Sequence, residues 1–197
     1  DKLYARLRQD FCSRFSIPAA LSVPFFGDIF SMHLKCATVG LNPSSGEYLD
    51  DYGKELEGSQ RRLHTLNSLG ASCRAMLTDE QCWRAISLMR DYFKQGQHYR
   101  WFNSLDAVIR SAGLSYHKGD TVHLDLVQEA VRVPYIDRKG KHGYGGWSKW
   151  KEIACEEVSS QLSLGLPFLR WELESFPFSV VLCDGATVGE EVAKQLG

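Results

Sequence analysis

Residues 33–46 read HLKCATVGLNPSSG and decide the expected fold. The stretch 33–41 becomes β-branched and apolar toward its end, as a buried strand does. It runs directly into residues 42–46 (NPSSG), a composition typical of a loop. Ligands of open α/β sheets bind beyond the carboxyl ends of the strands, so this junction is a candidate site.

Two further stretches also predict strands: 121–127 (TVHLDLV), in which apolar and polar residues alternate, and the apolar run 178–183 (FSVVLC). We expect helices between and around the strands, over 1–15, 59–69, 78–93, 99–112, 147–162, 167–176 and 187–196, and a loop over 132–146. Strands separated by helices favour an α/β fold with a parallel sheet covered on both faces. All three strand ends carry a polar residue: Asn42, Asp125 and Asp184.

The chain has 197 residues, with 23 Lys and Arg against 24 Asp and Glu, which gives a net charge of −1. Such a balance excludes nucleic-acid binding by bulk positive charge alone, though not a local basic strip. No stretch reaches the about 18 apolar residues of a membrane helix. The six cysteines are scattered without C-x-x-C spacing, which argues against a structural metal site and favours a reducing, cytoplasmic compartment. The first residue is Asp1 rather than Met, so we expect part of a longer polypeptide.

Residues 40–44 (GLNPS) resemble the first motif of the uracil-DNA glycosylase superfamily, a G-x-(D/N/E/A)-P loop directly after the first buried strand. The similarity is closest to the branches that read G-I-N-P or G-L-N-P. Further similar segments occur in the expected order, at 47–50, 53–56, 61–70, 101–103, 122–126 and 181–188. The resemblance implies one domain over residues 1–197, a three-layer α/β/α sandwich with a central, mainly parallel four-stranded sheet.

The resemblance also implies a monofunctional DNA glycosylase, which flips a target base and hydrolyses its N-glycosidic bond to leave an abasic site. Asn42 matches the position that holds the attacking water, and the backbone amides around Leu41 would stabilise the departing base. Ser44 or Ser45 would hold a phosphate. No lysine stands in this motif as a Schiff-base nucleophile, and no metal or cofactor is implied. The plainer alternative for residues 42–43 is an ordinary turn.

Asp125 departs from the uracil-specific members, which carry an asparagine at the matching place. An ionised aspartate only accepts hydrogen bonds, so it favours a base with an amino group at C4. We therefore expect a modified cytosine, such as glucosylated hydroxymethylcytosine in phage DNA, as the target. Uracil stays open if Asp125 is protonated or if Gln128 reads the base instead. A structural carboxylate with loop partners is the alternative role.

Other positions are candidates for base or DNA binding. Leu56 falls near the place where relatives stack an aromatic ring on the base, and Tyr48 is a candidate wall of the base pocket. His123 shares a strand face with Asp125 and can pair with it, or it is simply a buried, satisfied histidine. Residues 132–149 interleave basic and aromatic side chains, which suits contacts with phosphates and unpaired bases, or form a solvated loop. The candidate DNA contacts in this segment are Arg138, Lys139, Lys141 and Tyr144.

The last motif of the superfamily, a loop whose histidine stabilises the leaving base, does not occur in the sequence. We expect it beyond Gly197; without it the chain would be a catalytically weakened member. Two other classes stay open. One is an inactive relative that only binds damaged or foreign DNA, and the other is a nucleotide-binding protein that uses residues 185–189 at a helix N-terminus. DNA, double- or single-stranded, is the expected partner of a monomer.

Overall fold

The computed structural model describes residues 2–11, 13, 15–96, 100–136, 142–145 and 155–196. They form an α/β fold around a four-stranded sheet with strand order β1-β3-β2-β6. Its strands are β1 (Phe25–Phe26), β2 (Cys36–Gly40), β3 (Thr121–Asp125) and β6 (Val180–Cys183). β2 pairs in parallel with β3 and β6, whereas β1 pairs antiparallel with β3. The predicted α/β fold with a mainly parallel, four-stranded sheet is confirmed.

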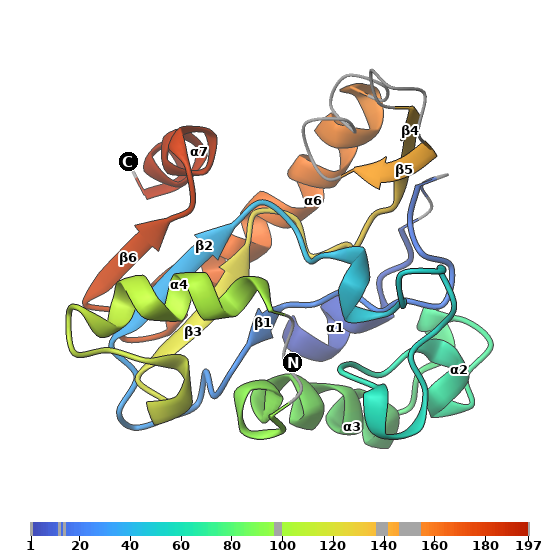
Figure 1. Ribbon diagram of the computed structural model, residues 1–197, viewed down its shortest axis with the longest axis horizontal. Coiled ribbons are helices and arrows are strands. Elements are labelled where there is room, and N and C mark those ends of the chain that lie inside the picture. Colours follow the sequence, from blue (N-terminus) through green and yellow to red (C-terminus); the bar gives the residue numbers. More distant parts are fainter. Residues whose placement is uncertain are drawn as a thin grey trace.

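Helices lie on both faces of the sheet, which is compatible with the expected three layers (Figure 1). α4 (Trp101–Arg110) crosses one face, and α6 (Cys155–Ser175) passes behind the strands on the other. α7 (Ala186–Leu196) follows β6 and contacts α6, while α3 (Asp79–Arg90) packs against β1. The remaining helices are α1 (Lys2–Arg8), α2 (Leu66–Leu69) and the 3-10 turns η1 (Ser45–Glu47), η2 (Gly58–Gln60), η3 (Arg74–Met76), η4 (Tyr92–Lys94) and η5 (Tyr116–Lys118).

The two central strands are fully buried because both of their faces are covered. Every residue of β2 and of β3 is buried, as expected for strands inside a parallel sheet. Their register pairs Cys36 with Thr121 at one end and Gly40 with Asp125 at the other. The carboxyl ends of the two strands therefore lie side by side, and the segments that follow them start from the same edge.

Local sequence signals fix the start of α3 and the end of α2 where the sequence predicts them. The Thr78 side chain accepts a hydrogen bond from the Gln81 amide at 3.2 Å, and the Gln81 side chain accepts one from the Thr78 amide at 2.9 Å. This reciprocal capping box satisfies two amides that the first helical turn leaves unpaired. Gly70 ends α2 in the left-handed region with a φ of 69°, where glycine lacks the steric penalty of other residues.

Several predicted elements are wrong in extent or type. The first helix ends at Arg8 instead of residue 15, because Phe15 packs with Val131, Val133 and Val158 in a separate cluster. Residues 59–69 hold η2 and α2 rather than one helix. The predicted loop 132–146 contains an antiparallel pair of strands, β4 (Val133–Ile136) and β5 (His142–Gly145).

Proline and aromatic positions account for the other differences. Pro167 lies inside α6 instead of separating two helices, because burial of the inward side of α6 holds the helix through it. β1 comes from a stretch that shows no strand pattern, since a two-residue strand depends on pairing with β3. The large apolar side chains of Trp83 on α3 and Val108 on α4 are 52% and 62% exposed.

Gly165 lets α6 lie directly against the turn that follows β3. A β-carbon at this position would lie 2.2 Å from the carbonyl oxygen of Leu126 and 3.1 Å from the α-carbon of Val127. Both neighbours are backbone atoms, so neither can rotate away. The absence of a side chain at residue 165 thus fixes how closely helix and sheet approach near the carboxyl end of β3.

We predict that Gly165→Ala lowers the free energy of unfolding by about 2 kcal/mol, because overpacking at backbone contacts costs about 1–3 kcal/mol. Gly189→Ala in α7 is the matched control, since a β-carbon there would meet only Cys183 at 3.8 Å. The control should be neutral or gain up to about 1 kcal/mol from helix propensity. Urea denaturation measures both, and equal stability of the two variants would contradict the assigned contact.

Candidate functional site

The loop after β2 and the turn after β3 are joined beyond the ends of the strands. The amide of Leu126 donates to the carbonyl of Gly40 at 3.0 Å, and the amide of Val127 donates to the carbonyl of Leu41 at 3.0 Å. This continued pairing brings Asn42 and Asp125 to the same edge of the sheet, as the sequence predicts. Polar residues from two strand ends therefore meet where open α/β sheets bind ligands.

Asp125 is a buried carboxylate that is only partly satisfied. Its side chain is 2% exposed, and its Oδ1 lies 3.4 Å from Nε2 of His123. Its Oδ2 is buried and has no hydrogen-bond partner within the described part of the chain. Burial raises the pKa of Asp125, with a smaller contribution from Asp184, while His123 opposes the shift. Loop amides would satisfy a purely structural carboxylate, and no described amide reaches Oδ2.

His123 is held at both ring nitrogens. Its Nδ1 lies 2.8 Å from Oγ1 of Thr38, which in turn lies 2.7 Å from the hydroxyl of Tyr116. Its Nε2 faces Asp125, so the predicted pairing of these two residues is present. Aromatic rings surround the imidazole, with Phe102 at 5.1 Å and Trp101 at 5.2 Å between centroids. The orientation of His123 is therefore fixed by packing as well as by hydrogen bonds.

Gly40 makes room for this histidine–aspartate pair. A β-carbon at residue 40 would lie 2.7 Å from Oδ1 of Asp125 and 2.9 Å from Nε2 of His123. No real β-carbon approaches polar atoms so closely, so a side chain here would push the pair apart. The first glycine of the GLNPS segment thus has a steric role that depends on the strand beside it.

The side chains of the loop after β2 form a compact turn. Nδ2 of the half-buried Asn42 donates to the carbonyl of Pro43 at 2.9 Å. Oγ of Ser44 accepts from the amide of Gly46 at 3.1 Å and caps η1. These contacts are those of an ordinary turn, but they leave the Asn42 amide oxygen without a hydrogen bond in the described part of the chain. Ser45 is half-buried beside them.

Two further buried carboxyl groups lie near Asp125, and neither was predicted from the sequence. Glu47 is 1% exposed and accepts from the hydroxyl of Tyr92 at 2.5 Å; burial raises its pKa to about 8, Asp125 adds to the shift, and Arg62 opposes it. Glu172 is fully buried, and neither of its oxygens has a partner among the residues that the structure describes. Burial and Asp125 raise its pKa well above the ordinary value. The position of Glu172, three residues after the buried Leu169 on α6, is the pattern that could have revealed it.

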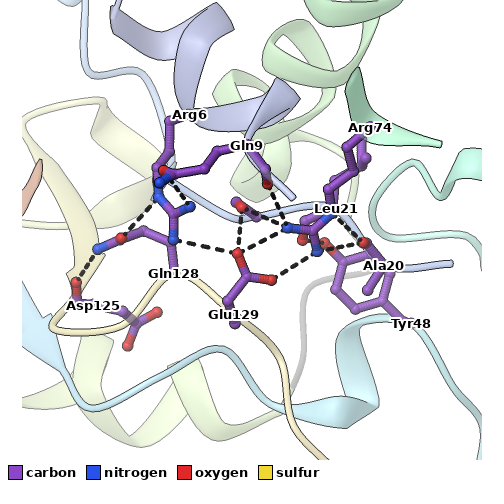
Figure 2. Close-up of polar contacts among 10 residues, drawn as sticks. Arg6, Gln9, Ala20, Leu21, Tyr48, Arg74, Asp125, Gln128 and Glu129 are labelled. Atoms are coloured by element: carbon purple, nitrogen blue, oxygen red, sulfur yellow. Dashed lines mark hydrogen bonds and ion pairs between the residues drawn. The ribbon is translucent and has the colours of Figure 1, made fainter. Parts of the chain in front are cut away.

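A buried polar network holds the turn after β3 from below (Figure 2). Nε2 of Gln128 donates to the backbone carbonyl of Asp125 at 2.8 Å, and Nε of Arg6 donates to Oε1 of Gln128 at 3.2 Å. Glu129 lies 3.3 Å from Arg6 and 2.7 Å from Arg74. These two guanidinium groups lower the pKa of Glu129 despite its burial. Both ends of the Gln128 amide are occupied, whereas Oδ2 of Asp125 has no hydrogen-bond partner among the described residues.

The other predicted site residues lie away from this edge or outside the description. Tyr48 is buried in the core and donates its hydroxyl to the carbonyl of Leu21 at 2.8 Å. Leu56 is 7% exposed, and its amide donates to the carbonyl of Tyr48 at 2.8 Å. Their packing gives both residues structural contacts. Arg138, Lys139 and Lys141 fall outside the described residues, and Tyr144 lies in β5.

No protein-family model, curated protein or solved structure matches this chain. Within the described ranges, no helix is long and apolar enough to cross a membrane. Nor do the described histidine, cysteine and acidic side chains form a group of three that would hold a metal ion. The features that distinguish the site are therefore an unpartnered carboxylate oxygen, a fixed histidine and a tight polar turn.

The raised pKa of Glu47 predicts a pH-dependent stability. In the unfolded chain this group ionises near its ordinary value of 4.5, whereas in the folded protein it keeps its proton to about pH 8. Stability is therefore lost as the pH rises through this window, by about 3 kcal/mol at pH 7. We predict that Glu47→Gln exceeds the wild type in free energy of unfolding by an amount that grows between these two pH values.

Urea denaturation at pH 5, 6, 7 and 8 measures this difference. Glu174→Gln is the control, because Glu174 is exposed on α6 and surface substitutions usually change stability by less than about 0.5 kcal/mol. A constant offset between Glu47→Gln and wild type across the whole range would contradict the assigned burial of the charge.

Proposed function

We propose that the protein is a monofunctional DNA glycosylase whose Asp125 reads a base flipped out of DNA. The observation that carries this proposal is the buried, unpartnered Oδ2 of Asp125 beside the 42–46 loop. A flipped base presents unsatisfied polar atoms, and unstacking it costs a few kcal/mol that a matching pocket offsets. A buried acceptor without a partner is the kind of group that such a base edge satisfies.

In this proposal Asn42 positions the attacking water. Its amide oxygen can accept a hydrogen bond from water, while its Nδ2 is held by the carbonyl of Pro43. An amide is a poor general base, so most of the acceleration must come from stabilising the negative charge on the departing base. Backbone amides around Leu41 and Asn42 are the proposed donors to that base, and Ser44 or Ser45 the proposed contact to a phosphate.

The state of Asp125 sets which base is favoured. An ionised Oδ2 accepts from the exocyclic amino group of a cytosine, whereas a protonated Oδ2 donates to O4 of uracil. Because excision of ordinary cytosine would destroy the genome of the cell, we propose a modified cytosine, such as the glucosylated hydroxymethylcytosine of phage DNA. Anti-phage defence, with base-excision repair of uracil as the alternative, is the corresponding role of a cytoplasmic monomer.

An inactive relative that only binds damaged or foreign DNA is the second candidate. The contact that favours it is the hydrogen bond from Nδ2 of Asn42 to its own neighbour Pro43, which an ordinary turn also makes. The two candidates differ in one measurable outcome, the formation of abasic sites.

We expect abasic sites in oligonucleotides that carry the target base, tested with uracil, hypoxanthine, cytosine, 5-hydroxymethylcytosine and its glucosylated form. Asn42→Ala should lower the rate by about 100-fold, the size of effect expected when a reacting water is no longer held in position. Asn67→Ala, an exposed asparagine bonded to Glu55, is the control with an unchanged rate. If none of the five substrates forms abasic sites while DNA binding is retained, the glycosylase proposal fails and the inactive DNA-binding relative is supported.

Asp125→Asn should shift base choice toward uracil, because an amide can both donate to O4 and accept from N3–H. Asp91→Asn is its matched control, because it makes the same substitution at an exposed aspartate that pairs with Lys94. The control should leave the ranking of the five substrates unchanged. An Asp125→Asn variant with the wild-type ranking would remove Asp125 from base reading.

A further inference from the structure

A cavity lies between α3 and the segment that includes η2. It has a volume of about 310 Å³, enough for a tetrahedral anion with several waters. Its lining consists of Gly58, Ser59, Arg61, His64, Leu88 and Gln95. None of these residues belongs to the group around Asp125, so this cavity is distinct from the proposed base site.

Arg61 places an unsatisfied cationic group in the lining. Its Nε is buried and has no hydrogen-bond partner among the described residues, although Arg61 as a whole is only half-buried. A buried donor that loses water without gaining an acceptor is unfavourable. Guanidinium groups match the paired oxygens of phosphate and carboxylate groups. The unpaired Nε therefore points to an anionic ligand with oxygen acceptors.

His64 reports a positive potential in the same cavity. Its pKa is lowered to about 4, by burial first and then by the charges of Arg84 and Arg61. Its Nδ1 lies 2.9 Å from Oγ of Ser68, and that hydroxyl donates to the carbonyl of Thr65 at 3.0 Å. Ser68 must then accept from Nδ1–H, which leaves Nε2 of the imidazole for a protonated oxygen of a ligand.

A neighbouring contact links the cavity segment to the loop after β2. The guanidinium of Arg62, next to Arg61, donates to the carbonyl of Gly46. The chain that carries Arg61 is thus anchored to the loop that holds Asn42. A ligand bound at Arg61 would therefore lie next to Arg62, the residue that contacts the loop of the proposed base site.

We propose that this cavity binds a phosphate group, held by Arg61 with Ser59 and His64 and favoured by the charge of Arg84. Phosphate binding at this cavity is a separate property from the proposed base removal and does not depend on it. A hydroxyl, a guanidinium and a neutral imidazole together offer donors and one acceptor, which suits a phosphate that carries one proton near pH 7 better than a carboxylate. The phosphate can belong to a nucleic-acid backbone or to a small phosphorylated molecule.

The test is titration of the purified protein with sodium phosphate at pH 7 and constant ionic strength, followed by calorimetry and by the imidazole resonances of His64. We expect saturable binding, with sodium chloride giving none. Arg61→Gln should weaken binding at least about tenfold, because charge-assisted hydrogen bonds are among the strongest. Arg170→Gln, which removes an exposed arginine paired with Glu174 on α6, should bind as the wild type does.

Arg61→Lys keeps the charge and should fall between wild type and Arg61→Gln, which separates loss of the ligand contact from a folding defect. A single-stranded thymidine 12-mer then distinguishes the sources. Displacement of the oligonucleotide by phosphate, and its loss in Arg61→Gln, would identify a backbone phosphate; phosphate binding without oligonucleotide competition would identify a small phosphorylated ligand. No saturable binding of either probe, or equal weakening in Arg170→Gln, would overturn the proposal.

Discussion

The buried ion cluster of Glu129 with Arg6 and Arg74 is the interaction on which the site depends. It connects α1, η3 and the turn after β3, three segments that are far apart in the sequence. Two guanidinium groups compensate one carboxylate that is 1% exposed, so removing either cation would leave a buried charge poorly paired. Arg6 also donates to the side chain of Gln128, which in turn donates to the carbonyl of Asp125. The cluster therefore also fixes the backbone of the candidate site.

Three buried carboxyl groups near the carboxyl end of β3 are electrostatically unfavourable in their ionised form. Asp125, Glu47 and Glu172 are all buried, and burial is the largest cause of the raised pKa in each case. Packing alone would select apolar residues at such positions. Groups with perturbed pKa values concentrate at functional sites, where a ligand or a reaction uses the tension that folding leaves there. Glu129 differs from these three groups, because Arg74 and Arg6 pair with it and lower its pKa despite its burial.

Local sequence signals predicted those parts of the fold whose cause is local. β2 was recognisable because a strand covered on both faces is apolar along its length, and β3 because apolar and polar residues alternate along it. α3 was recognisable because its capping box lies within four residues. β1 was not, since Phe25–Phe26 becomes a strand only through pairing with β3. Pro167 gave a misleading signal, because tertiary burial of α6 outweighs the local preference for a break.

The candidate site shows the same division. The strand-end rule placed Asn42 beside Asp125, but the burial of Glu47 and Glu172 depends on packing that no local pattern encodes. Tyr48 was assigned to a base pocket by its place in the chain, while its hydroxyl is bonded to the carbonyl of Leu21.

Gly40 has an evolutionary consequence. Its missing side chain leaves the space that Asp125 and His123 occupy, so residue 40 and residue 125 form an epistatic pair. A lineage that keeps the carboxylate can accept no side chain at residue 40. Because His123 would also lie within 3.0 Å of a β-carbon, only a lineage that replaces both Asp125 and His123 by smaller residues is released from that restriction. Variation at the first glycine should therefore follow, and never precede, loss of this pair.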